Sequence, residues 1–277
     1  MKEKMNDQPQ LQWHPAFYAG LQIEFEEEKD KLIFENEHHL GTKPKEIDVL
    51  IIKRKSTEEI KKNIGRIFRQ HNIIEYKSPD DYLSIDDFYL VYAYACLYKS
   101  DTPTVDEISA KEITITFVCS KYPRNLIKHL VYIRKYNIEK IENGVYYVKG
   151  DFFPIQIIIT KELSDATNLW LHNLRNDISE RNIIRQLLLE YQKHDKANLY
   201  ASVIDIIATA NKETFLEVTN MSKVLEEIFL EVHGERLERE KQKAIDEAVA
   251  EAVAEAVAEK DAYIKELEAK LAQQNNS

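Results

Sequence analysis

The sequence predicts an α/β protein: a mixed β-sheet flanked by helices, followed by a helical region and a long helical tail. Two runs rich in β-branched and apolar residues, 47–53 and 71–77, are typical of buried strands. Ser84 is followed three residues later by Asp87, which is the capping-box pattern of a helix start. From Ala244 onward, a tetrapeptide repeat of strong helix formers predicts the tail helix.

The elements expected before residue 165 alternate between helix and strand. Apolar residues at helical spacing predict a first helix over 15–29. A strand, a crossover helix and a returning strand favour a mixed sheet with helices packed on it. The remaining expected elements are strands at 31–35, 47–53, 71–77, 112–120 and 152–160, a hairpin arm at 144–149, a helix from 84 to about 98 and a short helix over 57–62.

After about Leu163 the pattern changes to helices alone, with helical periodicity at 178–191, 199–210 and 213–232. Beyond Gly234 the chain becomes polar and repetitive. We therefore expect four parts: a disordered lead-in (1–11), an α/β domain (12–165), a helical subdomain (166–233) and a charged helical or coiled-coil tail (234–277).

Composition excludes several classes of protein. The 277 residues are 44% hydrophobic and 31% charged, with a formal charge of −10, which argues against a protein coated along its length by nucleic acid. No apolar run reaches the length of a membrane span, and residues 1–10 lack the apolar core of a signal peptide, so we expect a cytoplasmic protein with no membrane contact. Cys96 and Cys119 lie in apolar runs without metal-ligand spacing, which predicts two buried free thiols.

The strand at 71–77 carries charged residues where a core strand would have none. Side chains alternate along a strand, so Glu75 and Lys77 share one face while Tyr76 points to the other. If the run containing Asp48 pairs beside it, a second carboxylate approaches Glu75, and such a site can hold a divalent metal next to a lysine. The alternatives are a solvated strand edge for Glu75 and Lys77, and a turn cap or a salt bridge with Lys77 for Asp48.

The set Asp48 and Glu75-x-Lys77, after a helix bearing Glu24 and before a helix and another strand, resembles the PD-(D/E)xK nuclease superfamily. The segment 64–98 resembles a bacterial group within it, the transposase-like or recombination-promoting nucleases, and the resemblance covers about residues 11–165. It implies a restriction-endonuclease-like fold and a metal-dependent DNA endonuclease linked to mobile elements or recombination. The proline of the family motif is replaced by Ile47.

The resemblance also implies a role for each site residue. Asp48, Glu75 and the backbone carbonyl of Tyr76 would hold Mg²⁺, with Mn²⁺ as an alternative, and Lys77 would position or deprotonate the attacking water. Glu24 would be an outer ligand or a water anchor. Phosphodiester hydrolysis needs such groups because the attacked phosphorus centre is already negatively charged. The rival interpretation is a catalytically inactive nuclease fold that binds nucleic acid or protein.

Other charged groups have less specific interpretations. The acidic residues between 80 and 87 are explained by turn and cap chemistry rather than by a metal site. Basic residues are candidates for contacts with DNA phosphates on an otherwise acidic protein, although solvated faces explain most runs of charge. These candidates are Lys53, Arg54, Lys55, Lys61, Lys62, Arg66 and Arg69, with Lys121, Arg124, Lys128, His129, Arg134 and Lys135.

The tail predicts self-association through residues 244–271. Apolar residues recur every four positions from Ile245 to Val257, so the apolar stripe drifts by about 40° per repeat around the helix. Ile264, Leu267 and Leu271 then follow heptad spacing, which predicts a conventional seam after a loose one. We expect a homo-oligomer; the alternative is a solvated single helix.

Overall fold

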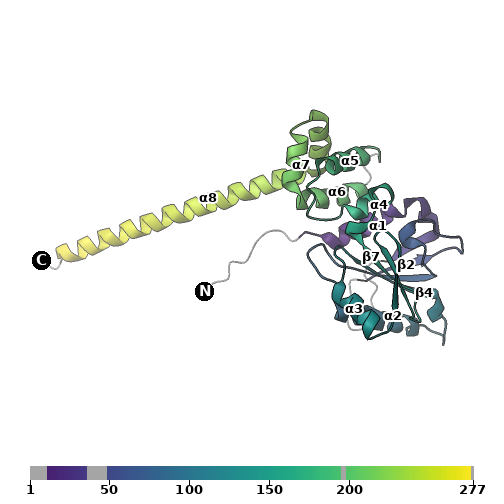
Figure 1. Cartoon of the computed structure of the whole chain (residues 1–277). Coiled ribbons are helices and arrows are strands. Elements are labelled where there is room, and N and C mark those ends of the chain that lie inside the picture. The colour runs from purple at the N-terminus through teal and green to yellow at the C-terminus, as the bar shows by residue number, and fades with distance from the viewer. Residues whose placement is uncertain (1–10, 36–48, 195–197, 276–277) are drawn as a thin grey trace. The chain divides into compact units, whose positions relative to one another are not determined.

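A seven-stranded mixed sheet with helices on both faces forms the body of the protein (Figure 1). The computed structural model describes residues 11–35, 49–194 and 198–275. The strand order in the sheet is β1-β2-β3-β4-β7-β6-β5. Helices α1, α4 and α6 lie on one side of the sheet, and α2 and α3 lie on the other (Figure 1). The predicted α/β class with a mixed sheet is therefore confirmed.

The first half of the sheet follows the predicted order of elements. Strands β1, β2 and β3 are antiparallel neighbours, whereas β4 runs parallel to β3 after the crossover through α2. These elements are α1 (Trp13–Glu24), the 3₁₀ helix η1 (Glu26–Lys31), β1 (Leu32–Glu35), β2 (Val49–Arg54), η2 (Asn63–Gly65), β3 (His71–Tyr76), α2 (Ile85–Ser100), η3 (Ala110–Glu112) and β4 (Ile113–Cys119).

The second half contains two elements that were not predicted, helix α3 and strand β5. Helix α3 is amphipathic but only nine residues long, and β5 is an edge strand with mostly exposed residues, so neither contains the long apolar run that predicted the other elements. These elements are α3 (Arg124–Tyr132), β5 (Asn137–Glu142), β6 (Val145–Lys149), β7 (Ile155–Ile159) and η4 (Thr160–Glu162).

The rest of the chain is largely helical, as expected. The predicted helix over 213–232 is wrong in one respect, because a break near Asn220 divides it between α7 and the start of α8. The chain divides between Leu225 and Glu226 into two compact units, and the predicted boundaries at 165 and 233 stay predictions. The helices are α4 (Asp165–His172), α5 (Arg181–Gln192), α6 (Asn198–Ala210), α7 (Lys212–Thr219) and α8 (Lys223–Asn275).

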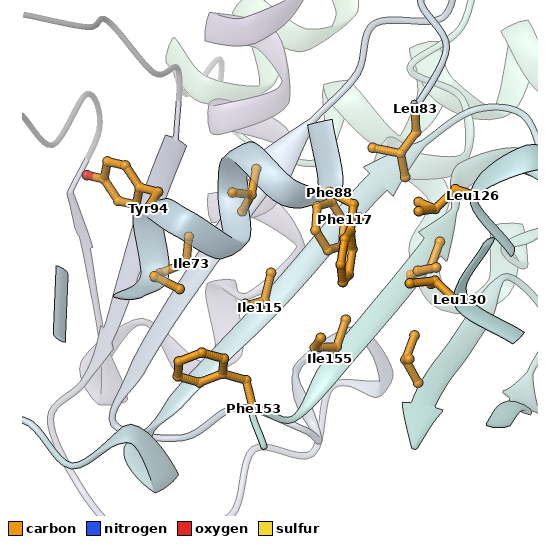
Figure 2. Packing of buried hydrophobic residues seen from close by; sticks show 14 of the residues in the cluster. Ile73, Leu83, Phe88, Tyr94, Ile115, Phe117, Leu126, Leu130, Phe153 and Ile155 are labelled. Carbon is orange, nitrogen blue, oxygen red and sulfur yellow. The ribbon is translucent and has the colours of Figure 1, made fainter. Parts of the chain in front are cut away.

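Alternating side chains on the central strands separate two layers of packing. Ile73 and Phe117 face α2, where Phe88 stacks on Phe117 with ring centroids 5.6 Å apart (Figure 2). On the other face, Tyr76 stacks on Phe17 of α1 at 4.0 Å. Aromatic pairs thus pack on both faces of the central strands, Phe88 with Phe117 of β4 on one face and Phe17 with Tyr76 of β3 on the other.

Helix α2 begins as predicted. The Ser84 hydroxyl accepts a hydrogen bond from the Asp87 N–H at 3.1 Å, and the Asp87 carboxylate accepts one from the Ser84 N–H at 2.8 Å. The predicted burial of Cys96 is wrong, because the buried stripe of α2 passes through Val91, Ala95 and Tyr98 and leaves Cys96 exposed. Cys119 is buried, and both thiols are free. Among the described residues, no helix combines the length and apolarity needed to span a membrane.

The short helix expected over 57–62 does not form, and η2 at Asn63–Gly65 replaces it. Tertiary contacts use its backbone groups instead. The carbonyl of Glu59 accepts from the Lys31 ammonium at 3.4 Å, and the N–H of Lys61 donates to the Glu28 carboxylate at 2.6 Å. Contacts with distant segments thus outweigh the weak local preference for a helix.

Gly65 lies where side chains pack too closely for a methyl group. A Cβ there would lie 2.5 Å from Cε1 of Phe25 and 2.7 Å from Cγ2 of Ile60, whereas a Cβ at Gly20 would meet Val203 at 4.0 Å. We predict that Gly65→Ala lowers the free energy of unfolding by about 1–3 kcal/mol. Gly20→Ala, the control within α1, should leave it unchanged or raise it by up to about 1 kcal/mol. Urea denaturation of both variants tests this, and equal effects would contradict it.

Candidate active site at the end of strand β3

Glu75 and Lys77 lie at the carboxyl end of β3, where the parallel strands β3, β4 and β7 end together. The N–H of Lys77 donates to the Val118 carbonyl at 2.8 Å, so the contact with β4 extends past the end of the strand. Glu75 is 8% exposed, and thus no solvated edge residue. Ligands of open α/β sheets commonly bind at this edge.

The ammonium of Lys77 lies between two carboxylates. Its Nζ is 2.9 Å from Oε1 of Glu75 and 3.0 Å from Oδ1 of Asp87. The Lys77 and Asp87 side chains are each 22% exposed and that of Glu75 is 10% exposed, so this triad is partly screened from solvent. Glu75 comes from the strand and Asp87 from the first turn of α2, so the site joins two elements.

Electrostatics favour a charged lysine at this site. Burial by itself lowers the pKa of Lys77, but attraction and hydrogen bonds from Glu75 and Asp87 outweigh burial and raise that pKa. Burial likewise disfavours the Asp87 carboxylate, but hydrogen bonds from Ser84 and the nearby Lys77 lower its pKa overall. Lys77 is therefore suited to offset negative charge rather than to accept a proton.

Asp87 is the site residue that the sequence pattern did not indicate. It was interpreted as a helix cap, which it is, but its second carboxylate oxygen also contacts Lys77. A signal exists in the spacing, because a short turn after Lys77 leads directly into the capping box and brings the helix start back to the strand end. This spacing alone does not show whether Asp87 only caps the helix or also contacts Lys77.

Tyr76 points away from Glu75 and Lys77, as strand alternation predicts. Its ring is buried against Phe17 and lies edge-on to His14, and burial raises the pKa of its phenol. The phenol oxygen has no hydrogen-bond partner among the described residues. The side chain is thus a core element, and the role of the backbone carbonyl as a metal ligand stays a prediction.

Asp48 lies outside the described residues, so its place in the site stays a prediction. The strand that follows it is described: β2 lies beside β3, with Val49 paired with Glu75. Within the described ranges, no three or more His, Cys, Asp or Glu side chains form a group that could hold a metal ion. Of the two carboxylates predicted to bind the metal, Asp48 and Glu75, the structure therefore describes Glu75 alone.

Glu24 belongs to a different cluster on the face of the sheet that carries α1. One carboxylate oxygen accepts from the backbone N–H groups of Trp170 and Leu171 in α4 at 3.1 and 3.0 Å. The other accepts from Asn168 at 3.3 Å and pairs with Lys62 at 2.5 Å. These contacts give Glu24 a structural role that joins α1 to α4, and none of them reaches Lys77.

Of the neighbouring acidic residues, Asp81 has the predicted role in the turn, whereas Asp80 contacts a distant segment. Asp81 accepts a hydrogen bond from the Ser78 hydroxyl within the turn at 2.7 Å, and Asp80 accepts one from Asn176 at 2.8 Å. The loop is also tied to β4, because the Ser120 hydroxyl donates to the carbonyl of Pro79 at 3.2 Å. The turn after Lys77 is therefore anchored on both sides.

The candidate phosphate contacts divide into paired and unpaired groups. Several basic side chains have intramolecular partners, such as Lys53 with Glu35 at 2.7 Å and His129 with the Tyr89 hydroxyl at 2.9 Å. Others are exposed and have no side-chain hydrogen bond or ion pair within the described part of the chain. These are Lys55, Lys61, Arg69, Lys121, Arg124, Lys128 and Lys135.

Two of these unpaired cations follow the strand next to the site. Lys121 and Arg124 come shortly after β4, whose end lies beside Lys77.

Comparisons with known proteins found no relative of this chain. No family model, curated protein or solved structure matches the chain.

The contacts of Glu24 predict a loss of stability when it is removed. Glu24→Ala leaves two backbone N–H groups of α4 without their acceptor and Lys62 without its partner, so we expect the free energy of unfolding to fall by about 2–4 kcal/mol. Glu27→Ala, at an exposed position of η1, should change it by less than about 0.5 kcal/mol. Chemical denaturation measures both, and an unchanged stability of Glu24→Ala would contradict the structural role.

Proposed function

We propose that the protein is a metal-dependent phosphodiesterase of the PD-(D/E)xK type that cleaves DNA, with its active site at the end of β3. The observation that carries the proposal is the contact of the Glu75 carboxylate with the Lys77 ammonium, at 2.9 Å, at the carboxyl end of a central strand. A link to mobile elements or recombination rests on the resemblance alone.

The arrangement of elements supports this proposal. Helix α1, the antiparallel strands β1 to β3, helix α2 and the parallel strand β4 follow the order expected of a restriction-endonuclease-like fold. Strand β3 is central and buried, so a charged pair at its end is costly unless the charges are compensated or used. The Glu75–Lys77 pair at the end of β3 is therefore a candidate functional site rather than a source of stability.

The donor chemistry fits a hard cation. Glu75 offers a largely buried carboxylate, and Mg²⁺ typically takes one or two carboxylates from protein and keeps several waters. Glu75 would hold the ion together with Asp48 and the carbonyl of Tyr76, as the resemblance implies. When bound, the ion would neutralise charge on the phosphate and lower the pKa of a bound water.

Lys77 supplies a fixed positive charge at this site. Its ammonium has two carboxylate partners, which leaves one of its three N–H groups for a water or a phosphate oxygen. Lys121 and Arg124 offer further positive charge at the same edge, where they would contact the DNA backbone with little reading of sequence. DNA binding by this edge should therefore weaken as salt rises.

The rival proposal is an inactive nuclease fold that binds nucleic acid or protein. The presence of both Glu75 and Lys77 argues against it, because a carboxylate and an ammonium at the end of a buried strand are costly to desolvate and an inactive fold does not need them. The rival keeps nucleic acid, or a protein, as the partner of the fold but has no cleavage step. Cleavage is what distinguishes them.

Plasmid cleavage with Mg²⁺ or Mn²⁺ tests the proposed activity. We expect wild type to nick or linearise DNA and to lose this activity in EDTA, while Asp48→Ala, Glu75→Ala and Lys77→Ala reduce the rate at least about 100-fold. Asp86→Asn, at an exposed position beside the site, should keep the wild-type rate. Equal rates in wild type and Lys77→Ala would disprove the site, and inactive wild type that still binds DNA would favour the rival.

We also propose that the tail helix α8 associates with the tail of a second copy. Ile245, Val249, Val253 and Val257 are 51–57% exposed and form a continuous apolar row rather than scattered single residues. The repeat glutamates lie two positions on, about 200° around the helix, so two apolar faces can meet without bringing these carboxylates together. Alanines on either side of each valine allow close approach.

The four-residue step affects the geometry of this contact. Side chains four apart form a ridge, and two such ridges pack with the helices crossing at about −50°, unlike a coiled-coil seam. The predicted seam at Ile264, Leu267 and Leu271 stays a prediction, because those side chains lie outside the described ones. The first part of the tail thus favours a local crossing.

Sedimentation velocity of the full chain tests self-association. We expect the double variant Val249→Glu/Val253→Glu to be monomeric at concentrations where wild type is oligomeric, because it places charge in the apolar row. Glu251→Gln/Glu255→Gln, on the opposite side of the helix, should remain oligomeric. Identical sedimentation of all three proteins would rule out the apolar row as the contact.

A further inference from the structure

We propose that Asp87 is a positioning residue that holds the ammonium of Lys77 at the active site, in addition to capping helix α2. The inference rests on the proposed function for its catalytic meaning. Its geometry, however, stands independently of any reaction.

The two oxygens of Asp87 have different partners. Oδ2 accepts from the N–H of Ser84 at 2.8 Å and from its hydroxyl at 2.7 Å, which completes the capping box. Oδ1 lies 3.0 Å from Nζ of Lys77. A helix cap needs one acceptor oxygen, so the contact with Lys77 is an additional use of the same carboxylate.

The contact restrains a side chain that is otherwise among the most mobile. A lysine loses much rotamer freedom when it is fixed, and one ion pair on an exposed side chain rarely fixes it. Lys77 is instead held from two sides, by Glu75 of β3 at 2.9 Å and by Asp87 of α2 at 3.0 Å. Its position is thereby set by the packing of α2 on the sheet, which is well defined because Phe88 and Val91 are fully buried.

Two variants separate the cap from the contact with Lys77. Asp87→Asn keeps an oxygen for the Ser84 N–H but turns an NH₂ group, which cannot accept, toward Lys77. Ser84→Ala removes the hydroxyl from the cap but leaves the Asp87 carboxylate beside Lys77. If Asp87 acts as a cap alone, Ser84→Ala should be the more harmful change.

Kinetics of the full-length variants give the first measurement. For Asp87→Asn we expect kcat for DNA cleavage to fall at least about 10-fold, with KM within about twofold of wild type, because the reacting group and not DNA binding is disturbed. Ser84→Ala should lower the thermal midpoint while kcat stays within about twofold of wild type. The proposal would be overturned if kcat fell in proportion to the loss of thermal stability in both variants.

Side-chain mobility gives a second measurement that needs no activity. With ¹³C-labelled lysine, relaxation of the Lys77 Cε, assigned through Lys77→Arg, should show a lower order parameter in Asp87→Asn and an unchanged one in Ser84→Ala. Lys161, paired with Asp177, is the internal control. Unchanged mobility of Lys77 in Asp87→Asn would overturn the positioning role, whereas inactive wild-type protein would contradict the nuclease proposal and leave this measurement to decide.

Discussion

The alternation of side chains along β3 is the constraint on which the rest of the structure depends. This strand is paired on both edges and covered on both faces, so each residue is assigned to one layer. Ile73, Glu75 and Lys77 belong to the layer of α2, while Tyr76 belongs to the layer of α1, where it stacks on Phe17. A shift of the β3 pairing register by one residue would move each side chain to the opposite face of the sheet, so Glu75 and Lys77 would no longer face α2.

Buried polar side chains hold the segment between β2 and β3 against the layer of α1. Asn72, which is fully buried, donates to the carbonyls of Ile52 and Arg69 and accepts from the N–H of Arg69. Gln156 donates to the carbonyl of Ile64, and Glu24 binds Lys62 nearby. Such groups are costly to bury unless they are bonded, so this network specifies one path for a loop that lacks regular structure. It also explains why Glu24, a candidate ligand by resemblance, has a structural role.

The site itself combines a local and a distant contact. Glu75 and Lys77 are neighbours on one strand, so their proximity follows from the chain alone, whereas Asp87 comes from a helix that must pack correctly on the sheet. Because Asp87 also caps that helix, the start of α2 and the position of Lys77 depend on one side chain. The cap thereby connects the stability of the helix with the geometry of the proposed catalytic group.

Strong local patterns determined much of this protein: the strands β2, β3, β4 and β7, the capping box of α2, the helical tail and the shared face of Glu75 and Lys77. These follow from periodicity and from hydrogen bonds within a few residues. Only the tertiary structure decided that Glu24 binds backbone N–H groups of α4, that Asp87 reaches Lys77, that Cys96 is exposed and that residues 57–62 are not helical. Each of these outcomes depends on which segments, distant in the chain, come into contact, and the free energy of those contacts exceeds the local preferences that a sequence pattern records.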